Sequence, residues 1–331
     1  MRHPRRAGSV QDRHRGVQGS RLGERVSRMA DKQSVGFIGA GNMGWPMAAC
    51  LVKAGFPVNI SDSRREVAHN FVQQVGGFAP DTLRDLAGKS DVVVTMLPTS
   101  AIVETVLTGG DDNIFAGMKP GTIVIDMTSG IPSVTQRLAE RVAELGGMLI
   151  DAPVSGGVPR AKTGELAIMV GGDGAAIDKA MPVLSAMGTS VLRTGGVGSG
   201  QAMKALNNLV STGGFLIGIE ALLIGQRFGL DPAVMTDVLN AATGMNNSTQ
   251  KKFKQFVLSR TFNAGFTMGL LAKDLSIALQ VGRETGTAAP LSALVKEFIV
   301  SAEAKFGPNA DHTEMARLCE ILAGSELGGG D

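Results

Sequence analysis

The sequence predicts an α/β protein in which a doubly wound, mostly parallel sheet is followed by an all-α C-terminal domain. Short apolar runs alternate with helical patterns from residue 34 to residue 195, which is typical of successive βαβ units. After residue 196 the strand patterns stop and helical patterns alone continue. A chain of 331 residues is long enough for one large domain or two ordinary ones.

The expected strands are short and apolar throughout, as is usual for parallel strands that are buried on both faces. They are expected at 34–39, 57–62, 91–97, 121–127, 148–153, 166–172 and 190–195. Helices are expected where apolar residues recur at helical spacing. In the first half these are 43–56, 64–74, a segment after Pro98, 132–145 and 175–187.

The second half is expected to open on one long helix, because residues 200–230 contain no proline. At 1.5 Å per residue that helix would span about 45 Å. Asp231 followed by Pro232 has the form of a helix cap and a first-turn proline. Further helices are expected at 232–242, 247–258, 268–286, 290–305 and 312–322. The predicted domains are therefore a sheet domain at 31–195 and a helical substrate and dimerisation domain at 196–331.

Residues 1–30 carry eight arginines and two acidic residues, so they form a strongly basic head. Their apolar content is low, which favours disorder. An arginine-rich, acid-poor head superficially resembles an organelle transit peptide. We favour a disordered head, or upstream sequence that precedes a true start at Met29.

The rest of the chain is mildly acidic, since the whole carries a formal charge of +2 and the head supplies more than that. No nucleic-acid-binding face is indicated. No apolar run approaches the length of a membrane span, so no membrane association is expected. Cys50 and Cys319 match neither a disulfide framework nor a metal site, which favours a reducing, cytoplasmic location.

A glycine fingerprint, Gly39-x-Gly41-x-x-Gly44, lies between the first expected strand and the first expected helix. In this setting the motif indicates a Rossmann-type dinucleotide-binding domain. The first glycine permits a tight turn, the second lets a pyrophosphate approach the backbone, and the third lets helix pack on strand. The predicted cofactor-binding residues here are Gly39, Ala40, Gly41, Asn42, Met43 and Gly44.

The end of the second strand bears on the choice of cofactor. Asp62 lies 18 residues after Gly44, where a carboxylate would accept hydrogen bonds from the ribose hydroxyls of NAD and repel a 2′-phosphate. Arg64 and Arg65 follow closely and could instead hold the phosphate of NADP. We predict NAD, with NADP as the alternative.

Elimination points to a lysine as the group that moves a proton. The chain has no tyrosine, and of its four histidines two lie in the head, His69 lies on a remote helix and His312 near the C-terminus. No set of ligands supports a catalytic zinc. Lys204 begins the long helix where the two domains meet, and Asn208 lies one turn further on the same face. The alternative is a solvated stripe on that helix.

Two other stretches are candidates for the site. Ser155, Gly156 and Gly157 follow an expected strand and could bind a carboxylate, although an ordinary hairpin loop is an equal alternative. Lys273 and Asp274 form an unusual charged pair in an apolar helix. Their alternative is that both side chains point to solvent or to each other.

Taken together, these motifs resemble the β-hydroxyacid dehydrogenase family. The motifs "GFIGAGNMG", "DAPVSGG", "GSGQAMKALNN" and "KDL" occur in family order, and the resemblance runs from about residue 34 to residue 320, nearly the whole folded chain. The resemblance implies a reversible hydride transfer between NAD(P) and a small β-hydroxy acid or semialdehyde. It also implies assembly through the helical domains, as a homodimer or homotetramer.

The resemblance also implies roles for individual residues. Lys204 would be the catalytic acid and base, and Asn208 would orient substrate beside it. Ser155, Gly156, Gly157 and Asp274 would bind substrate. The further cofactor contacts implied are Leu97, Pro98, Ser129 and Lys273, with Thr128 as an alternative register for Ser129.

Two departures narrow the expected reaction. Related 6-phosphogluconate dehydrogenases carry histidine where this chain has Asn207, which argues against decarboxylation of a sugar phosphate. Imine reductases of similar architecture usually lack the lysine that is present here as Lys204. We expect a 3-hydroxyisobutyrate-like substrate first, and tartronate semialdehyde or another C3–C4 semialdehyde or sulfonate-aldehyde second. A non-catalytic nucleotide-binding protein is a third alternative.

The loop at 244–266 is expected to line the substrate side. Lys251, Lys252, Lys254 and Arg260 lie in it and could serve an anionic ligand, but a solvated helix face is favoured for cations at this spacing.

Overall fold

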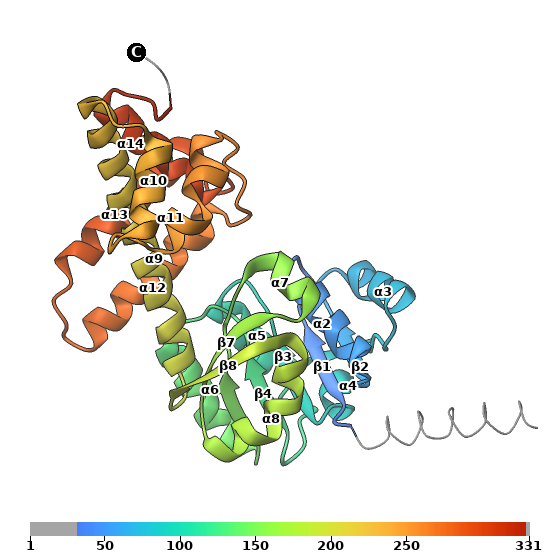
Figure 1. The fold of residues 1–331 in the computed structure, drawn as a ribbon. Helices are drawn as coiled ribbons and strands as arrows, with labels where there is room; N and C mark the ends of the chain where they lie inside the picture. Colours follow the sequence, from blue (N-terminus) through green and yellow to red (C-terminus); the bar gives the residue numbers. More distant parts are fainter. Residues whose placement is uncertain (1–31, 329–331) are drawn as a thin grey trace, which may run out of the picture.

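The computed structural model describes residues 32–328 and has two parts, a sheet domain and a helical domain. Helix α9 (Ser199–Phe228) runs from the first part into the second (Figure 1). The predicted α/β class, with an all-α C-terminal domain, is confirmed. The predictions for residues 1–30 lie outside the described residues.

The sheet has eight strands in the order β2-β1-β3-β4-β5-β7-β6, with β8 paired to β7. The strands are β1 (Val35–Ile38), β2 (Val58–Ser61), β3 (Val92–Thr95), β4 (Ile123–Asp126), β5 (Met148–Asp151), β6 (Val154–Ser155), β7 (Leu166–Gly171) and β8 (Gly188–Gly195). Strands β1 to β5 pair in parallel, whereas β7 is antiparallel to β5 and β6. The chain leaves β1 in one direction to β2 and returns past it to β3, as in a doubly wound fold.

Helices cover both faces of this sheet. One buried core joins the sheet to α2, α3, α7 and α8, and a second joins its other face to α4, α5 and α6. These helices are α2 (Gly44–Lys53), α3 (Arg65–Gln74), α4 (Leu83–Gly88), α5 (Ser100–Thr108), α6 (Pro132–Glu144), α7 (Gly157–Thr163) and α8 (Gly174–Met187). The central strands are buried on both sides because both faces are covered, which explains their uniformly apolar sequences.

The structure differs from expectation at three short elements. Strand β6 and helices α4 and α7 were not anticipated. Helix α7 begins at a glycine, contains Pro159 and has seven residues, so its sequence has the appearance of a turn. The glycines after Ser155 therefore join a strand to a helix and are not the loop of a hairpin.

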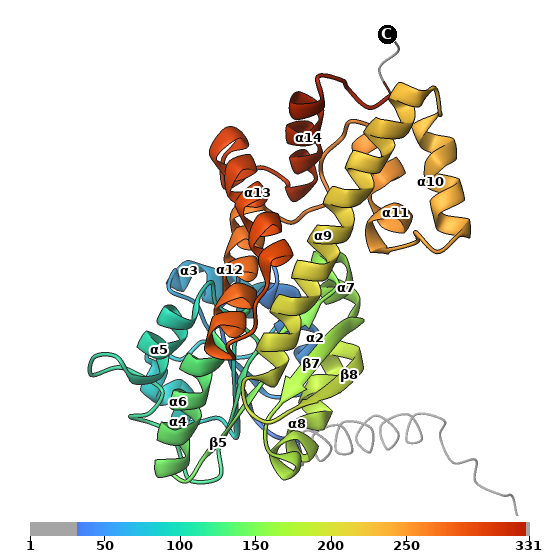
Figure 2. The same cartoon turned by 90° about the vertical axis from the view of Figure 1, so that its left-hand side faces the viewer.

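The helical domain packs around the upper half of α9, and Figure 2 shows α12 and α13 alongside it. Its elements are α10 (Pro232–Ala241), α11 (Asn247–Lys251), the π-helix η1 (Phe253–Leu258), α12 (Met268–Glu284), α13 (Pro290–Phe306), the 3₁₀-helix η2 (His312–Glu314) and α14 (Met315–Ala323). The expected single helix at 247–258 is interrupted at Lys252, whose φ of −129° ends α11. The interruption lets the Phe253 ring pack edge-on against Phe215 of α9, with 5.5 Å between centroids.

Helix α9 has an 18-residue window with a mean hydropathy of 1.5, so by length and composition alone it could cross a membrane. The expectation that no apolar run reaches this length is therefore not met. Of that window, 44% is buried inside the structure. The core helix of a soluble protein passes the same test, so this finding is weak evidence for a span.

The core of the helical domain should be sensitive to the loss of the Phe215 ring, which is fully buried. Phe215→Ala is expected to lower the free energy of unfolding by about 3–5 kcal/mol, because it removes apolar burial and leaves a cavity. Chemical denaturation followed by circular dichroism measures this. Leu192→Ala, at a side chain that is 55% exposed, should change the same quantity by less than about 1 kcal/mol. Equal losses in the two variants would contradict this assignment of the core.

Candidate active site

The turn between β1 and α2 has the geometry that the glycine fingerprint predicts. Gly39 has a φ of +99°, which disfavours other residues, and its N–H donates to the Ser61 carbonyl at 2.9 Å. A Cβ on Gly44 would clash with the Gly39 carbonyl oxygen, so helix and strand meet at the backbone. A Cβ on Gly41 would meet no atom within 4 Å. The middle glycine thus faces open space at the start of a helix, where a pyrophosphate fits.

Asp62 connects the end of β2 to this turn. Its carboxylate accepts hydrogen bonds from the Ala40 N–H at 2.9 Å and from the Arg64 N–H at 3.0 Å. The Arg64 guanidinium also lies 3.6 Å from it, on a side chain that is 65% exposed. The Asp62 carboxylate and the Arg64 guanidinium therefore lie together at the end of β2, where the ribose of the dinucleotide is expected. Arg65 instead donates to the Asp81 carbonyl.

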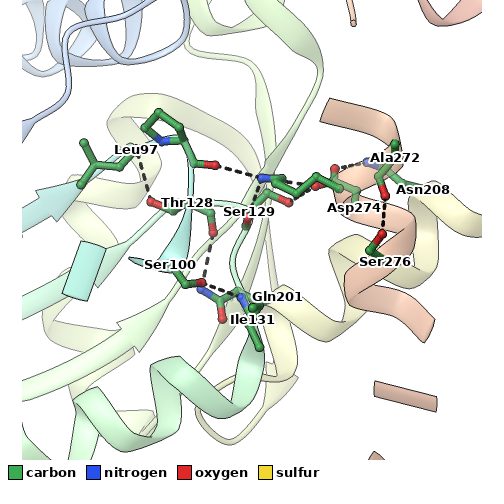
Figure 3. Close-up of polar contacts among 12 residues, drawn as sticks. Leu97, Ser100, Thr128, Ser129, Ile131, Gln201, Asn208, Ala272, Asp274 and Ser276 are labelled. Atoms are coloured by element: carbon green, nitrogen blue, oxygen red, sulfur yellow. Dashed lines mark hydrogen bonds and ion pairs between the residues drawn. The ribbon is translucent and has the colours of Figure 1, made fainter. Parts of the chain in front are cut away.

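The loops that follow β3 and β4 lie next to each other because those strands are neighbours. The Leu97 N–H donates to the Thr128 hydroxyl at 3.1 Å, and Thr128 is fully buried. The Ser129 hydroxyl points away from this contact toward the helical domain (Figure 3). Ser129, and not Thr128, therefore presents its hydroxyl at the junction of the domains.

Asp274 of α12 is the point where three segments meet. Its carboxylate accepts the Ser129 hydroxyl at 2.8 Å and the Asn208 amide at 2.7 Å, and the side chain is buried (Figure 3). Lys273 donates from the same helix to the carbonyls of Ser129 at 2.7 Å and Pro98 at 3.2 Å. Lys273 Nζ also lies 3.5 Å from the Asp274 carboxylate, so the two side chains do contact each other. The charged pair on α12 nevertheless faces the sheet domain, and neither side chain simply points to solvent.

Lys204 lies one turn before Asn208 on α9 and is partly buried. Burial lowers the pKa of its ammonium group below the ordinary value, while the Asp274 carboxylate raises it and the Lys273 ammonium lowers it further. Within residues 32–328 we find no hydrogen bond or ion pair to the Lys204 ammonium. Burial thus makes the charged form of Lys204 less favourable, and the hydrogen-bonded Asn208 amide lies one helical turn away.

The Ser155–Gly157 motif lies where β6 passes into α7, at the end of the sheet domain that faces the helical domain (Figure 1). Gly156 and Gly157 have φ values of 135° and 66°, and both are exposed. No described hydrogen bond connects this motif to Lys204 or Asp274. The structure thus joins Asn208, Lys273, Asp274 and Ser129 in one network, with Lys204 one helical turn from Asn208, and leaves this motif outside it.

Three buried polar residues were missed by the sequence analysis. Asp126, Asp151 and Gln201 form a hydrogen-bonded group under the start of α9, with Gln201 contacting both carboxylates. Burial raises the pKa of both aspartates, that of Asp151 to about 6. The sequence signal that could have identified the two aspartates is an acidic residue at the end of each of two apolar strands, "IVID" and "MLID".

The cations of the 244–266 loop are accounted for differently. Lys254 pairs with Asp237 at 2.6 Å, and Arg260 pairs with Glu320. Lys251 is exposed, whereas Lys252 is partly buried and burial lowers its pKa to about 8. In the described part of the chain, no three His, Cys, Asp or Glu side chains are grouped as a metal site.

Family models cover both domains. The model for the NAD binding domain of 6-phosphogluconate dehydrogenase matches residues 34–196. A second model, described as NAD-binding of NADP-dependent 3-hydroxyisobutyrate dehydrogenase, matches residues 198–319.

Curated relatives match along most of their length. The chain is 36% identical to 2-(hydroxymethyl)glutarate dehydrogenase of Eubacterium barkeri, over 89% of this chain and 98% of that protein. It is 34% identical to 2-hydroxy-3-oxopropionate reductase of Escherichia coli, over 88% and 99%. The structure of Mycobacterium tuberculosis 3-hydroxyisobutyrate dehydrogenase with L-serine superposes with a TM-score of 0.80 at 30% identity, covering 87% of this chain and 99% of that one.

Two of the fingerprint glycines, Gly41 and Gly44, should respond differently to an added methyl group. Gly41→Ala is expected to leave the melting temperature unchanged and to weaken dinucleotide binding by about tenfold, because its Cβ enters the space for the pyrophosphate. Gly44→Ala should lower the melting temperature, because its Cβ clashes with the Gly39 carbonyl. Calorimetry of NAD(P) binding and thermal unfolding measure these effects. Full affinity in a stable Gly41→Ala variant would place the pyrophosphate elsewhere.

Proposed function

This chain belongs to the β-hydroxyacid dehydrogenase family and is an NAD(P)-dependent hydroxyacid oxidoreductase, and we propose that its substrate is 3-hydroxyisobutyrate or a close analogue. The observation that carries the proposal is the Lys204–Asn208–Asp274 arrangement at the junction of the domains. There Asn208 and Ser129 share the Asp274 carboxylate, and Lys273 contacts the loops that end β3 and β4.

The compounds named for the relatives share one chemical pattern. 3-Hydroxyisobutyrate, 2-(hydroxymethyl)glutarate and L-serine all have the form HOCH₂–CHR–COO⁻, with R being methyl, a propanoate chain or an ammonium group. 2-Hydroxy-3-oxopropionate is the aldehyde of the same pattern with R as hydroxyl. We therefore propose a primary alcohol separated by one carbon from a carboxylate as the substrate class, with small R groups preferred.

Lys204 provides the proton chemistry in this proposal. In oxidation the neutral amine takes the proton from the substrate hydroxyl as the C–H bond at the same carbon gives up a hydride and the C=O bond forms. In reduction the ammonium returns the proton to the carbonyl oxygen. The nicotinamide, when bound, supplies the hydride acceptor or donor. Because burial lowers its pKa, Lys204 gives up its proton more readily than an exposed lysine, which suits proton transfer in both directions.

Asp274 acts on the reacting groups through its neighbours. Both of its oxygens are used, by Ser129 and by Asn208, so we propose that it orients these side chains and does not itself bind the substrate carboxylate. Repulsion between two carboxylates supports this assignment. The substrate carboxylate is proposed to bind the exposed backbone of Ser155, Gly156 and Gly157.

A second candidate is the reduction of tartronate semialdehyde, and the 34% identity to the Escherichia coli reductase supports it. Sulfonate-aldehyde reduction is a further alternative.

For the cofactor we propose NAD, because Asp62 lies beside the fingerprint turn and carries a negative charge where NADP has a phosphate. Tighter binding of NADP than of NAD would reverse that choice.

We propose a homodimer, or a tetramer built from it, that forms through α9. Val210, Ile217 and Ile224 repeat every seven residues along this helix and are 75%, 64% and 71% exposed. Apolar side chains repeated on one face of a helix are typical of helix-to-helix interfaces. In this proposal one face of α9 contacts the partner subunit and its other faces pack in the helical core. Such packing favours a core helix over a membrane span. Sedimentation as a monomer would contradict the proposed dimer.

We further propose a cytoplasmic location and no nucleic-acid partner.

Removing the amine of Lys204 should abolish most turnover. Lys204→Ala is expected to lower kcat by at least about a hundredfold, because general acid–base catalysis supplies about that factor. The assay measures NAD(P) reduction with 3-hydroxyisobutyrate, glycerate, 2-(hydroxymethyl)glutarate and L-serine. Lys251→Ala removes the same charge at an exposed position and should leave kcat unchanged. Near-normal turnover by Lys204→Ala would rule out its role, and inactivity of the native protein on the whole panel would rule out the substrate class.

The pH dependence of oxidation should report the charge of Asp274. The rate rises with pH as Lys204 becomes neutral, and the Asp274 carboxylate raises the pKa of that lysine. Asp274→Asn is therefore expected to move the rising limb of kcat/KM to lower pH, whatever its effect on the maximal rate. Asp237→Asn, at a surface ion pair, should leave the limb in place. A shift to higher pH would contradict the charge coupling.

A further inference from the structure

Two aspartates outside the proposed chemistry are adjacent beneath α9. Asp126 ends β4 and Asp151 ends β5, and the two residues are partners in the parallel register of these strands. They are 1% and 0% exposed. Two carboxylates at such a place cost free energy unless specific hydrogen bonds compensate for the lost hydration. Their hydrogen-bond partners therefore indicate what they do.

Asp151 caps the long helix from a neighbouring strand. Its two oxygens accept the Gly198 N–H at 2.7 Å and the Gln201 N–H at 2.8 Å. Gly198 is the N-cap residue of α9, has a φ of 91° and has no side chain with which to cap the helix. The strand carboxylate thus takes the place of an N-cap side chain, and its charge suits the positive end of the helix.

Gln201 connects that capped turn to the loop that carries Ser129. Its side-chain amide donates to Asp126 at 3.0 Å, while Asp126 also accepts the Thr95 hydroxyl at 2.8 Å and the Thr128 N–H at 3.0 Å. Figure 3 shows Gln201 directly beside the loop from Thr128 onward. One residue therefore fixes α9 to the ends of both β4 and β5.

Close packing leaves this turn little freedom. A Cβ on Gly200 would clash with the Met169 carbonyl oxygen of β7 and would come within 2.9 Å of the Asp151 carboxylate. Lys204 follows Gln201 by three residues, about 4.5 Å along the same helix. A displacement of the first turn is thus passed directly to the Lys204 side chain.

We propose that Asp151 and Gln201 are positioning residues for the hydride-transfer reaction, because they set the position and rotation of the α9 turn that carries Lys204. This inference rests on the proposed acid/base role of Lys204. A misplacement of about 1 Å can cost up to about a hundredfold in rate. Because neither side chain lies among the proposed binding residues, substrate and cofactor affinity should change little.

The first test replaces Asp151 by asparagine, which turns an N–H donor toward the N–H groups of α9. Asp151→Asn is expected to lower kcat by about 10–100-fold, with KM for the hydroxy acid and Kd for NAD within about twofold of the native values. The matched control is Asp173→Asn, the same change at the residue that caps α8 through two backbone N–H groups. It should change neither the melting temperature nor kcat by much, because both N–H groups donate to the same Oδ1, which asparagine retains. A native kcat in folded Asp151→Asn would overturn the inference.

If Asp151→Asn does not fold, Gln201→Met answers the same question, because it keeps the backbone cap and removes the donor to Asp126. It is expected to lower kcat, again without a change in KM, and a native kcat would overturn the link through Gln201.

The second test repeats either substitution in a Lys204→Ala background. The two losses should not add, because the positioned group is gone. Additive losses would show a separate effect and overturn the inference. If Lys204→Ala alone stays active, the proposed function fails. If it is inactive while Asp151→Asn and Gln201→Met turn over normally, the positioning role alone fails.

Discussion

The carboxylate of Asp274 holds together segments that are far apart in the chain. It lies on α12, accepts a hydroxyl from the loop after β4 and accepts an amide from α9. Because it is nearly inaccessible to water, these bonds form in an environment where leaving either donor unpaired is costly. The same charge keeps the neighbouring Lys204 from losing its proton too easily. Joining the domains and raising the pKa of the proposed proton carrier are thus properties of one group.

The fold was largely predictable because its dominant signals are local. Parallel strands buried on both faces are uniformly apolar, and the glycines of the β1–α2 turn are required by backbone approach, so both can be recognised from sequence. Elements that depend on distant contacts were missed. Helix α7 combines glycines with Pro159, and η1 departs from α-helical geometry where Phe253 packs on Phe215 of α9.

The residues proposed for the site could be named in advance, but their contacts could not. The family resemblance implied roles for Lys204, Asn208 and Asp274, yet no pattern could show that Asp274 bonds Asn208 across 66 positions of the chain. The capping carboxylate of Asp151 was also beyond reach, since it lies 50 positions before the Gln201 N–H that it accepts. Polar contacts between elements depend on how the elements pack, and local sequence contains little of that information.

Helix α9, with 30 residues, extends through both domains. At its lower end it rests on β7 through glycine, and at its upper end it is the axis of the helical core. Because α9 is about 45 Å long, a tilt of about 5° at its first turn moves its far end by about 4 Å. The position of the helical core relative to the sheet domain therefore depends closely on the orientation of the first turn of α9.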